Sequence, residues 1–169
     1  MSSREHNQFL ATWAKEAQGT IRLLRALPAQ QYDFRPVADW RSLGELAWHL
    51  AEIDAYLADG AALGRIDFAR KLPGLERPRA IADLAPGYER VHGEAFAKVR
   101  DMKSEDFDRM MPSFDGTPIR TGDLLWGALL HHAIHHRGQL VTVCRMAGGL
   151  PPGLYGPNRE ETMVMRSGA

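Results

Sequence analysis

Apolar residues recur at steps of three and four along four long stretches of the chain, a spacing that places them on one face of an α-helix. The stretches cover residues 7–27, 42–60, 81–102 and 121–147. Pro28 ends the first stretch, and Ser42 opens the second three residues before Glu45, the spacing of a capping box at a helix start. Gly60 is expected to close the second stretch. The pattern therefore predicts four helices that account for most of the chain.

The fourth stretch differs from the others because it is apolar on nearly every side. A helix of this kind is normally covered by neighbours all round, so we expect it at the centre of the fold. It is expected to end at the pair Gly148-Gly149, because glycine commonly terminates helices.

The remaining segments are expected to connect or follow these helices. Residues 61–78 are rich in glycine, proline and charge and predict one long connection, and two short extended pieces are expected around 110–111 and 117–119. The C-terminal tail, 148–169, is dense in glycine and proline through Pro157 and is interpreted as irregular. Four helices with one long crossover connection predict an all-α four-helix bundle that forms a single domain over residues 1–169.

Charge and cysteine content narrow the function classes. The chain carries 21 basic and 21 acidic residues with a formal net charge of zero, and its one basic tract is the short Arg77–Arg79. It therefore lacks the electrostatic footprint of a nucleic-acid-binding protein. A single cysteine, Cys144, excludes an internal disulfide and fits a reducing compartment. No apolar run approaches the roughly 18 residues of a membrane span, and no signal-peptide core is visible, so we expect a cytoplasmic protein with no membrane partner.

Four of the seven histidines fall within residues 131–136. His132 and His136 are four residues apart, which places their Cβ atoms about 5–6 Å from each other on one helix face. Two imidazoles at that distance can converge on one metal ion at bonds of about 2.0–2.1 Å. Without an ion, each ring must be desolvated and hydrogen-bonded separately. His131 and His135 have the same spacing on a lighter face and are interpreted as surface, metal-supporting or dimer-facing residues.

Two ligands do not complete a metal site, and the best third candidate is His49. It lies at the margin of the apolar face of the second helix and should point toward a neighbouring helix. His6 and His92 are weaker candidates, because one precedes the first helix and the other lies on a mostly polar arc. Glu45 and Glu52, one turn to either side of His49, are interpreted as a helix-cap residue and a solvent-facing residue.

Three other residues near the histidines carry groups capable of chemistry. Gln139 lies one turn beyond His136 on nearly the same face and is the candidate catalytic residue, in contact with substrate or with a metal ligand. Arg137 projects to the other side and is interpreted as a structural ion-pair residue. Cys144 faces away from the histidine pair, so the protein does not supply a thiol of its own to the site.

Three motifs carry a family resemblance: SLGELAWHLAEID around His49, HRGQL from His136 onward, and GLYGP near the C-terminus. Together they resemble the DinB/YfiT-like family of metal-dependent four-helix-bundle enzymes, from the first helix to Pro157. The resemblance implies one divalent metal ion held by three histidines, one from the second helix and two from the last. In this chain these are His49, His132 and His136. A second register through His131 and His135 stays open, as does any role for Tyr155.

The family resemblance also implies a class of chemistry, although relatives share their fold more often than their reaction. We expect a divalent-metal-dependent enzyme of the thiol S-transferase or detoxification type, which joins a low-molecular-weight thiol to an electrophilic small molecule. Zinc or nickel is the favoured ion, with iron, manganese or copper as alternatives. The competing hypotheses are a non-catalytic metal-binding helical bundle of the stress response and a hydrolase that uses a metal-bound hydroxide. Relatives of this size also imply a homodimer.

Overall fold

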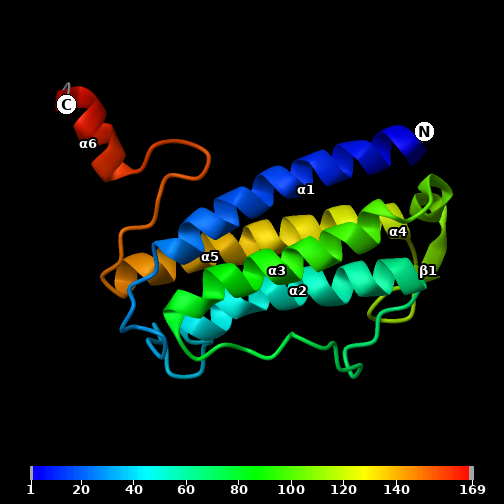
Figure 1. Ribbon diagram of the computed structural model, residues 1–169, viewed down its shortest axis with the longest axis horizontal. Coiled ribbons are helices and arrows are strands. Elements are labelled where there is room, and N and C mark those ends of the chain that lie inside the picture. Colours follow the sequence, from blue (N-terminus) through cyan, green and yellow to red (C-terminus); the bar gives the residue numbers. More distant parts are fainter. Residues whose placement is uncertain (1, 168–169) are drawn as a thin grey trace.

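A computed structural model of the chain describes residues 2–167 and consists of long helices packed side by side (Figure 1). The helical runs of the bundle are α1 (Ser2–Arg25), α2 (Leu43–Leu63), α3 (Ile81–Arg100) and a composite run from Thr121 to Met146. The predicted mostly helical bundle is thereby confirmed. Helix α1 begins before the predicted position because Glu5 and His6 find partners: Glu5 pairs with Arg120 at 2.7 Å, and the His6 ring lies 2.8 Å from the Val99 carbonyl oxygen.

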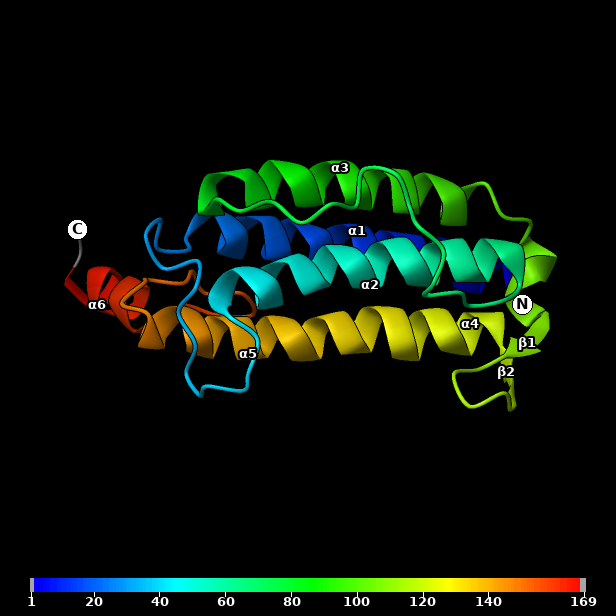
Figure 2. The ribbon, with the colours of Figure 1, turned by 90° about the horizontal axis from the view of Figure 1, so that it is seen from below.

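Helix α2 occupies the centre of the bundle, between α3 on one side and α5 on the other (Figure 2). Buried residues line most of its circumference, and the large side chains that fill the core come from several elements. The largest fully buried side chains are Phe9, Trp13, Leu23, Leu24, Leu43, Trp48, Leu50, Leu84, Phe107, Leu124, Leu125 and Leu129. The central helix is therefore the one that supplies His49.

The composite helix lies at the edge of the bundle and is exposed along one side, so the prediction of a central helix covered all round is wrong. It comprises α4 (Thr121–Leu124), a π-helical segment η2 (Leu125–His131) and α5 (His132–Met146). Its outward side carries exposed His131, His132, His135 and Gly138. Histidine and glycine at these positions add little apolar surface to the helix. The π-helical segment has more residues per turn than an α-helix, which shifts the buried face around the helix axis.

The end of α2 differs from the prediction for a local reason. Gly60 continues the helix, and a Cβ atom there would lie 3.3 Å from the backbone of Ile66, so glycine permits the following chain to pass close by. The helix instead ends at Gly64, whose φ of 74° is left-handed and favours glycine. The long connection to α3 therefore starts later than the predicted residue 61.

Two short strands follow α3 and the 3₁₀ turn η1 (Ser104–Asp108). Strand β1 (Met110–Pro112) pairs antiparallel with β2 (Pro118–Arg120), and Met111 lies opposite Ile119. This hairpin confirms the two predicted extended pieces.

The tail is irregular up to Asn158 and then forms α6 (Arg159–Ser167) beyond the end of the bundle, so the prediction of an irregular tail is wrong for that part (Figure 1). The reason is a reciprocal cap: the Asn158 side chain accepts from the Glu161 backbone N–H at 2.7 Å, and the Glu161 carboxylate accepts from the Asn158 N–H at 2.9 Å. Glu160 also pairs with Arg145. Residues 168–169 of the predicted tail lie outside the described residues.

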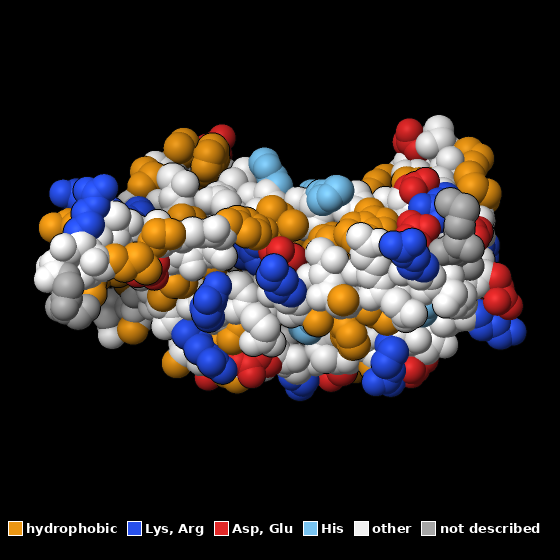
Figure 3. All heavy atoms as spheres, turned by 90° about the horizontal axis from the view of Figure 1, so that it is seen from above, with side chains coloured by type: hydrophobic (Ala, Val, Ile, Leu, Met, Phe, Trp, Pro, Cys, Tyr) orange, Lys and Arg blue, Asp and Glu red, His pale blue; other side chains and the backbone are white. Residues whose placement is uncertain are grey.

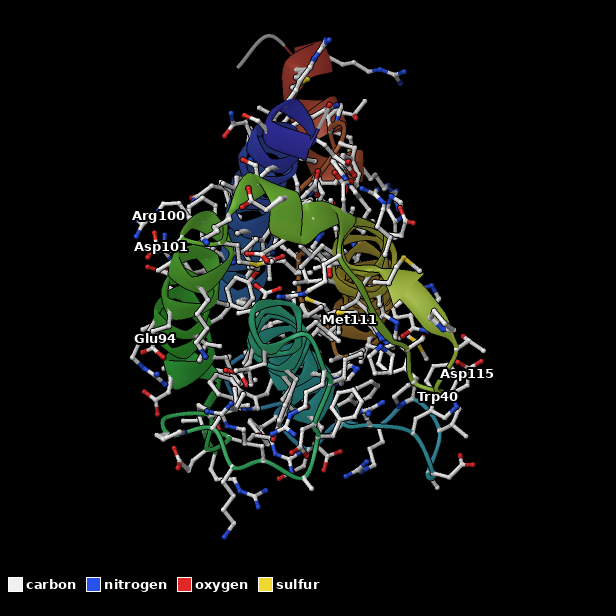
Figure 4. All side chains as sticks on the ribbon, turned by 90° about the vertical axis from the view of Figure 1, so that its right-hand side faces the viewer. Trp40, Glu94, Arg100, Asp101, Met111 and Asp115 are labelled. Carbon is white, nitrogen blue, oxygen red and sulfur yellow. The ribbon has the colours of Figure 1, made fainter. Side chains whose placement is uncertain are left out.

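Two irregular segments project past the exposed side of α5: residues 26–42, between α1 and α2, and the loop of the β1–β2 hairpin (Figure 2). Seen along the bundle axis, Trp40 of one segment and Asp115 of the other lie on the same side of the molecule, opposite Glu94 of α3 (Figure 4). The outward side of α5 is thus flanked by loops at two places along its length. Among residues 2–167, no helix is long and apolar enough to cross a membrane.

Candidate metal centre

Three histidines from two helices converge beside the outward side of α5. His49 comes from α2, and His132 and His136 come from the first two turns of α5. Each offers one ring nitrogen, and these three atoms lie within 4.8 Å of one another. The ring centroids are 4.4 Å apart for His132 and His136, 4.7 Å for His49 and His136, and 5.9 Å for His49 and His132. The structure therefore brings together the three histidines that the sequence singled out.

Local signals in the sequence fix the two helices that present these rings. Ser42 caps α2, because its hydroxyl accepts from the Glu45 N–H at 3.2 Å while the Glu45 carboxylate accepts from the Ser42 N–H at 2.8 Å. His49 follows two turns later on the side of α2 that faces α5. On α5, the four-residue spacing of the histidine pair follows directly after the π-helical segment, a feature often found at functional sites.

Glu52 and Gln139 determine which ring nitrogens are free to bind a metal. The Nδ1 atom of His49 lies 3.2 Å from a carboxylate oxygen of Glu52, and the Nδ1 atom of His136 lies 2.7 Å from the amide oxygen of Gln139. Both oxygens act as acceptors, so both Nδ1 atoms carry a proton and the two Nε2 atoms present lone pairs. A hydrogen bond on the far nitrogen is the usual way in which proteins orient a metal-binding histidine.

His131 and His135 stand outside the cluster. Gln139 links His135 to it indirectly, because its amide nitrogen donates to the Nε2 atom of His135 at 3.1 Å. Both histidines are exposed. Within residues 2–167, the three-histidine group is the only set of histidine, cysteine and acidic side chains with metal-binding spacing, so no second register is formed through His131 and His135.

The pKa values of the α5 histidines favour the neutral form that binds metals. Burial lowers the pKa of His136 from its ordinary value of 6.5 to about 4, even though the hydrogen bond to Gln139 opposes the change. Burial also lowers the pKa of His132, and the neighbouring His49, His135 and Arg41 act in the same direction. Near pH 7 both rings are therefore unprotonated and able to donate a lone pair.

Two pockets border the histidines. The first, which we call the aromatic pocket, has a volume of about 280 Å³ and is lined by His49, His132, Tyr56, Phe68 and Phe114 among others. The second, the polar pocket, has a volume of about 630 Å³ and is lined by Trp40, Glu45, Arg77, His136 and Gln139 among others. Arg41 borders both. In the space-filling view, histidine side chains lie at the surface in a hollow between two raised parts of the molecule (Figure 3).

The donor set fits a divalent metal ion. Imidazole nitrogens bind zinc at about 2.0–2.1 Å, and small side-chain rotations suffice to bring three nitrogens that already lie within 4.8 Å onto one ion. Structural zinc sites close with four protein ligands, whereas catalytic sites have three and keep one position for water or substrate. In the described part of the chain no fourth histidine, cysteine or carboxylate joins the group. The cluster therefore has the composition of an open site.

The weaker histidine candidates lie elsewhere in the bundle and have protein partners. The Nδ1 atom of His92 lies 2.8 Å from the buried carboxylate of Asp54, which also accepts from Trp13 at 3.2 Å and from Tyr88 at 3.1 Å. His6 is bound to a carbonyl oxygen, as described above. Neither belongs to the cluster.

Four further residues have partners in the structure that define their roles. Arg137 is buried and forms an ion pair with Glu16, which confirms its structural interpretation. The Tyr155 hydroxyl donates to the same Glu16 carboxylate at 2.6 Å, so this tyrosine ties the tail to α1. Glu45 caps α2 as predicted, but Glu52 holds His49 and is more than a solvent-facing residue. Its position three residues after His49 is the signal that identifies it.

Each comparison with known proteins covers most of the chain. The sequence model of the DinB family matches residues 1–166. The chain is 30% identical over 160 residues to the uncharacterized protein YrdA of Bacillus subtilis (strain 168), which covers 92% of this chain and 90% of that protein.

Two solved structures share the fold. A DinB-like protein of Bacillus subtilis, YjoA, superposes with a TM-score of 0.74 at 22% identity, over 89% of this chain and 99% of the other. A DinB-like protein of Bacillus cereus superposes with a TM-score of 0.72 at 25% identity, over 87% of this chain and 95% of the other.

Proposed function

Because the chain belongs to the DinB family, we propose that it is an enzyme that works with one divalent metal ion held by His49, His132 and His136. The observation that carries this proposal is the convergence of one nitrogen from each ring within 4.8 Å. The hydrogen bonds of Glu52 and Gln139 support it, since they leave Nε2 of two rings as the metal-facing atom. Zinc or nickel suits an all-imidazole donor set, and iron, manganese or copper compete through their availability in the cell.

The reaction that we propose is the transfer of a low-molecular-weight thiol to an electrophilic small molecule. A divalent ion with an open coordination position lowers the pKa of a bound thiol and so makes thiolate available near pH 7. The thiol proton passes to solvent, a sulfur–carbon bond forms, and the leaving group departs from that carbon with the bonding electron pair. The chain itself does not provide the sulfur, because Cys144 is fully buried and burial raises the pKa of its thiol.

The surroundings of the histidines suit a reaction of two unlike molecules. The polar pocket presents Arg77 and Gln139 and suits a thiol that carries charged or hydrogen-bonding groups. The aromatic pocket presents Phe68 and Phe114 and suits an electrophile with an apolar body. Both pockets reach the histidine cluster, so their occupants would meet beside it.

Gln139 has two roles in this proposal. It positions His136 through the hydrogen bond to Nδ1, and it also lines the polar pocket, where it can contact substrate. Arg41 borders both pockets and supplies a positive charge that attracts anionic groups toward the cluster. The Nε2 atom of His135 accepts a hydrogen bond from the amide nitrogen of Gln139 and so helps to fix the amide orientation.

Metal analysis tests the site. Protein purified without nickel resin is expected to contain about one equivalent of a divalent ion, because three imidazoles converge there. The variants His49→Ala and His132→Ala are expected to lose it, while His131→Ala serves as the matched control on the same helix turn and is expected to keep it. Equal metal content in His49→Ala and in the unchanged protein would remove the proposed site.

A second experiment tests the reaction. Metal-loaded protein is incubated with the electrophile 1-chloro-2,4-dinitrobenzene and, in turn, with glutathione, cysteine, coenzyme A and bacillithiol. We expect a conjugate to form with at least one thiol faster than in the His132→Ala variant. If metal is bound but no thiol gives a protein-dependent product, the transferase proposal fails and a non-catalytic metal-binding bundle becomes the better description.

A further inference from the structure

Two exposed phenylalanines from distant segments meet at the mouth of the aromatic pocket. Phe68 comes from the connection between α2 and α3, Phe114 comes from the hairpin loop, and the side chain of each is 58% exposed. Their rings are nearly parallel, with an interplanar angle of 8° and centroids 5.8 Å apart. Tyr56 meets Phe68 edge to face at 5.6 Å. Exposed aromatic surface in a concave place often marks a binding site, so this pocket is a candidate ligand site.

The pocket between these rings and the cluster is small and mostly apolar. Besides the aromatic rings, its lining includes the apolar Ile53, Leu57 and Ala128 and the two histidines His49 and His132. Its volume of about 280 Å³ lies at the lower end of ligand pockets, which range over roughly 300–1,000 Å³ for drug-sized molecules. A planar molecule of one or two rings matches this size.

Charge at the rim of the pocket comes mainly from Arg41. Two other arginines near the polar pocket, Arg35 and Arg77, are paired with Glu45 at 2.8 Å and 3.5 Å. Within the described range 2–167 no carboxylate lies at ion-pair distance from Arg41, which is exposed. The carboxylate that lines the pocket, Glu52, is bound to the ring of His49. The rim therefore offers a cation without a partner.

We propose that the aromatic pocket binds a planar aromatic molecule of one or two rings that bears a carboxylate or a similar anionic group. The ring packs against Phe68 and Phe114, where aromatic pairs prefer offset stacking, and the anionic group lies toward Arg41. This inference deepens the proposed function, since such a molecule would be the electrophilic partner of the thiol. Binding itself needs neither the metal nor the thiol, because the contacts come from side chains of the chain.

Isothermal titration calorimetry with two matched probes tests the pocket. The probes are 2-naphthoate and the neutral 2-naphthalenemethanol, titrated into protein that has been stripped of metal with EDTA. We expect naphthoate to bind more tightly than the alcohol. The variant Phe114→Ala is expected to weaken both probes about tenfold, the loss that one aromatic contact of about 1.4 kcal/mol produces.

The variant Arg41→Gln separates the charge from the ring contact. It is expected to bind the two probes equally, because only the anionic probe uses the arginine. Met163→Ala removes an equally exposed apolar side chain on α6, far along the chain from the pocket, and is expected to bind both probes as the unchanged protein does. Unchanged naphthoate binding in the double variant Phe68→Ala/Phe114→Ala would overturn the proposal.

The aromatic rings could instead form a contact between two copies of the chain, and the same variants test this. If neither probe binds and the double variant changes the elution volume in size-exclusion chromatography, the pocket is an interface and the proposal fails. Failure of the proposed function is recognised separately. A protein that binds naphthoate but holds no metal keeps the pocket and loses the metal-dependent reaction.

Discussion

Histidines occur in two regions of this bundle and meet different surroundings in each. In the core, His92 lies against Asp54 and its ring packs edge to face on Trp13, with centroids 4.8 Å apart. At the edge, His49 and His136 each have Nδ1 bound by a side chain, and each ring also offers one nitrogen to a group of three that lie within 4.8 Å of one another. Helix α2 contributes to both regions, through Asp54 and His49. The comparison teaches that the supply of partners, and not the residue type, separates a structural histidine from one that can offer a nitrogen to a metal ion.

The core group is closed around its carboxylate. Asp54 is fully buried and has donors on three sides, from Trp13, Tyr88 and His92. Burial, together with the nearby Asp54 carboxylate, raises the pKa of Tyr88 well above its ordinary value, so this hydroxyl remains a donor. The edge group has no such carboxylate at its centre. Its centre is instead formed by three ring nitrogens that lie within 4.8 Å of one another.

The largest expected effect comes from removing the centre of the core group. Asp54→Ala leaves two buried donors, Trp13 and Tyr88, and the half-buried His92 without their acceptor, and we expect the free energy of unfolding to fall by about 3–5 kcal/mol. Urea unfolding followed by circular dichroism measures this. Metal affinity per folded molecule should not change, because Asp54 does not contact the cluster. His49→Ala should show the opposite result, with metal lost and the metal-free stability little changed.

Asp54→Asn is the matched control for that experiment. The amide keeps the volume of the side chain and one acceptor oxygen, so the loss should be smaller than in Asp54→Ala. If Asp54→Ala abolishes metal binding while His92 and the fold are intact, the core group and the histidine cluster are coupled. The two regions would then not be independent.

A smaller effect is expected at the edge from Gln139→Ala. The variant frees the Nδ1 atom of His136, so the ring can rotate and can exchange its proton between the two nitrogens. Removing a partner of this kind typically costs about 10- to 100-fold in metal affinity. Competition titration with a zinc-binding dye measures it. Gln139→Glu keeps an acceptor at the same place and should retain most of the affinity, and equal losses in both variants would contradict the positioning role.

The fold and the histidine cluster could be predicted from the sequence because both depend on periodic or local signals. Apolar steps of three and four gave the helices, and the capping box at Ser42 gave the start of α2. The four-residue spacing of His132 and His136 gave the pair. His49 could be chosen among the single histidines because it lies at the margin of an apolar face, and the family resemblance selected the same residue.

The walls of the site could not be predicted because they come from irregular segments without a periodic pattern. Phe68 and Phe114 lie in loops, and only tertiary packing brings their rings together. The exposure of α5 could not be predicted either, because the π-helical segment changes the number of residues per turn just before His132. Helix α6 was missed because its start depends on the reciprocal hydrogen bonds between Asn158 and Glu161, and not on a periodic pattern.

A pH titration of the metal-free protein tests the burial of His136 in the edge group. The pKa of His136 falls from 6.5 to about 4 on folding, so the unfolded chain binds more protons between these values. Stability is therefore present above pH 6.5 and is lost as the pH falls toward 4, by about 1–2 kcal/mol once solvent screening of this partly exposed ring is allowed for. Urea unfolding at intervals from pH 7 to 4 measures the loss.

His136→Asn is the control for the pH experiment, since asparagine does not titrate in this range. The variant should lose less stability than the unchanged protein between pH 6.5 and 4. Identical curves would show that other groups carry the pH dependence. Saturating zinc should make the loss in the unchanged protein steeper, because protons and the ion then compete for the same lone pairs.

The smallest expected effect tests the helix that serves both regions. Ser42→Ala removes the hydroxyl that caps α2, and we expect a loss of about 1 kcal/mol in the free energy of unfolding, as for other N-cap serines. Asp at this position also caps helices, so Ser42→Asp should recover most of the loss.

The cap lies two turns before His49 and contacts neither group. An ion that binds only the folded chain adds stability that, at a fixed ion concentration, depends only on its dissociation constant. The rise in melting temperature on adding zinc should therefore be the same in Ser42→Ala as in the unchanged protein, whereas His49→Ala should show no rise. A smaller rise in Ser42→Ala would mean that the start of α2 also sets the position of the His49 ring.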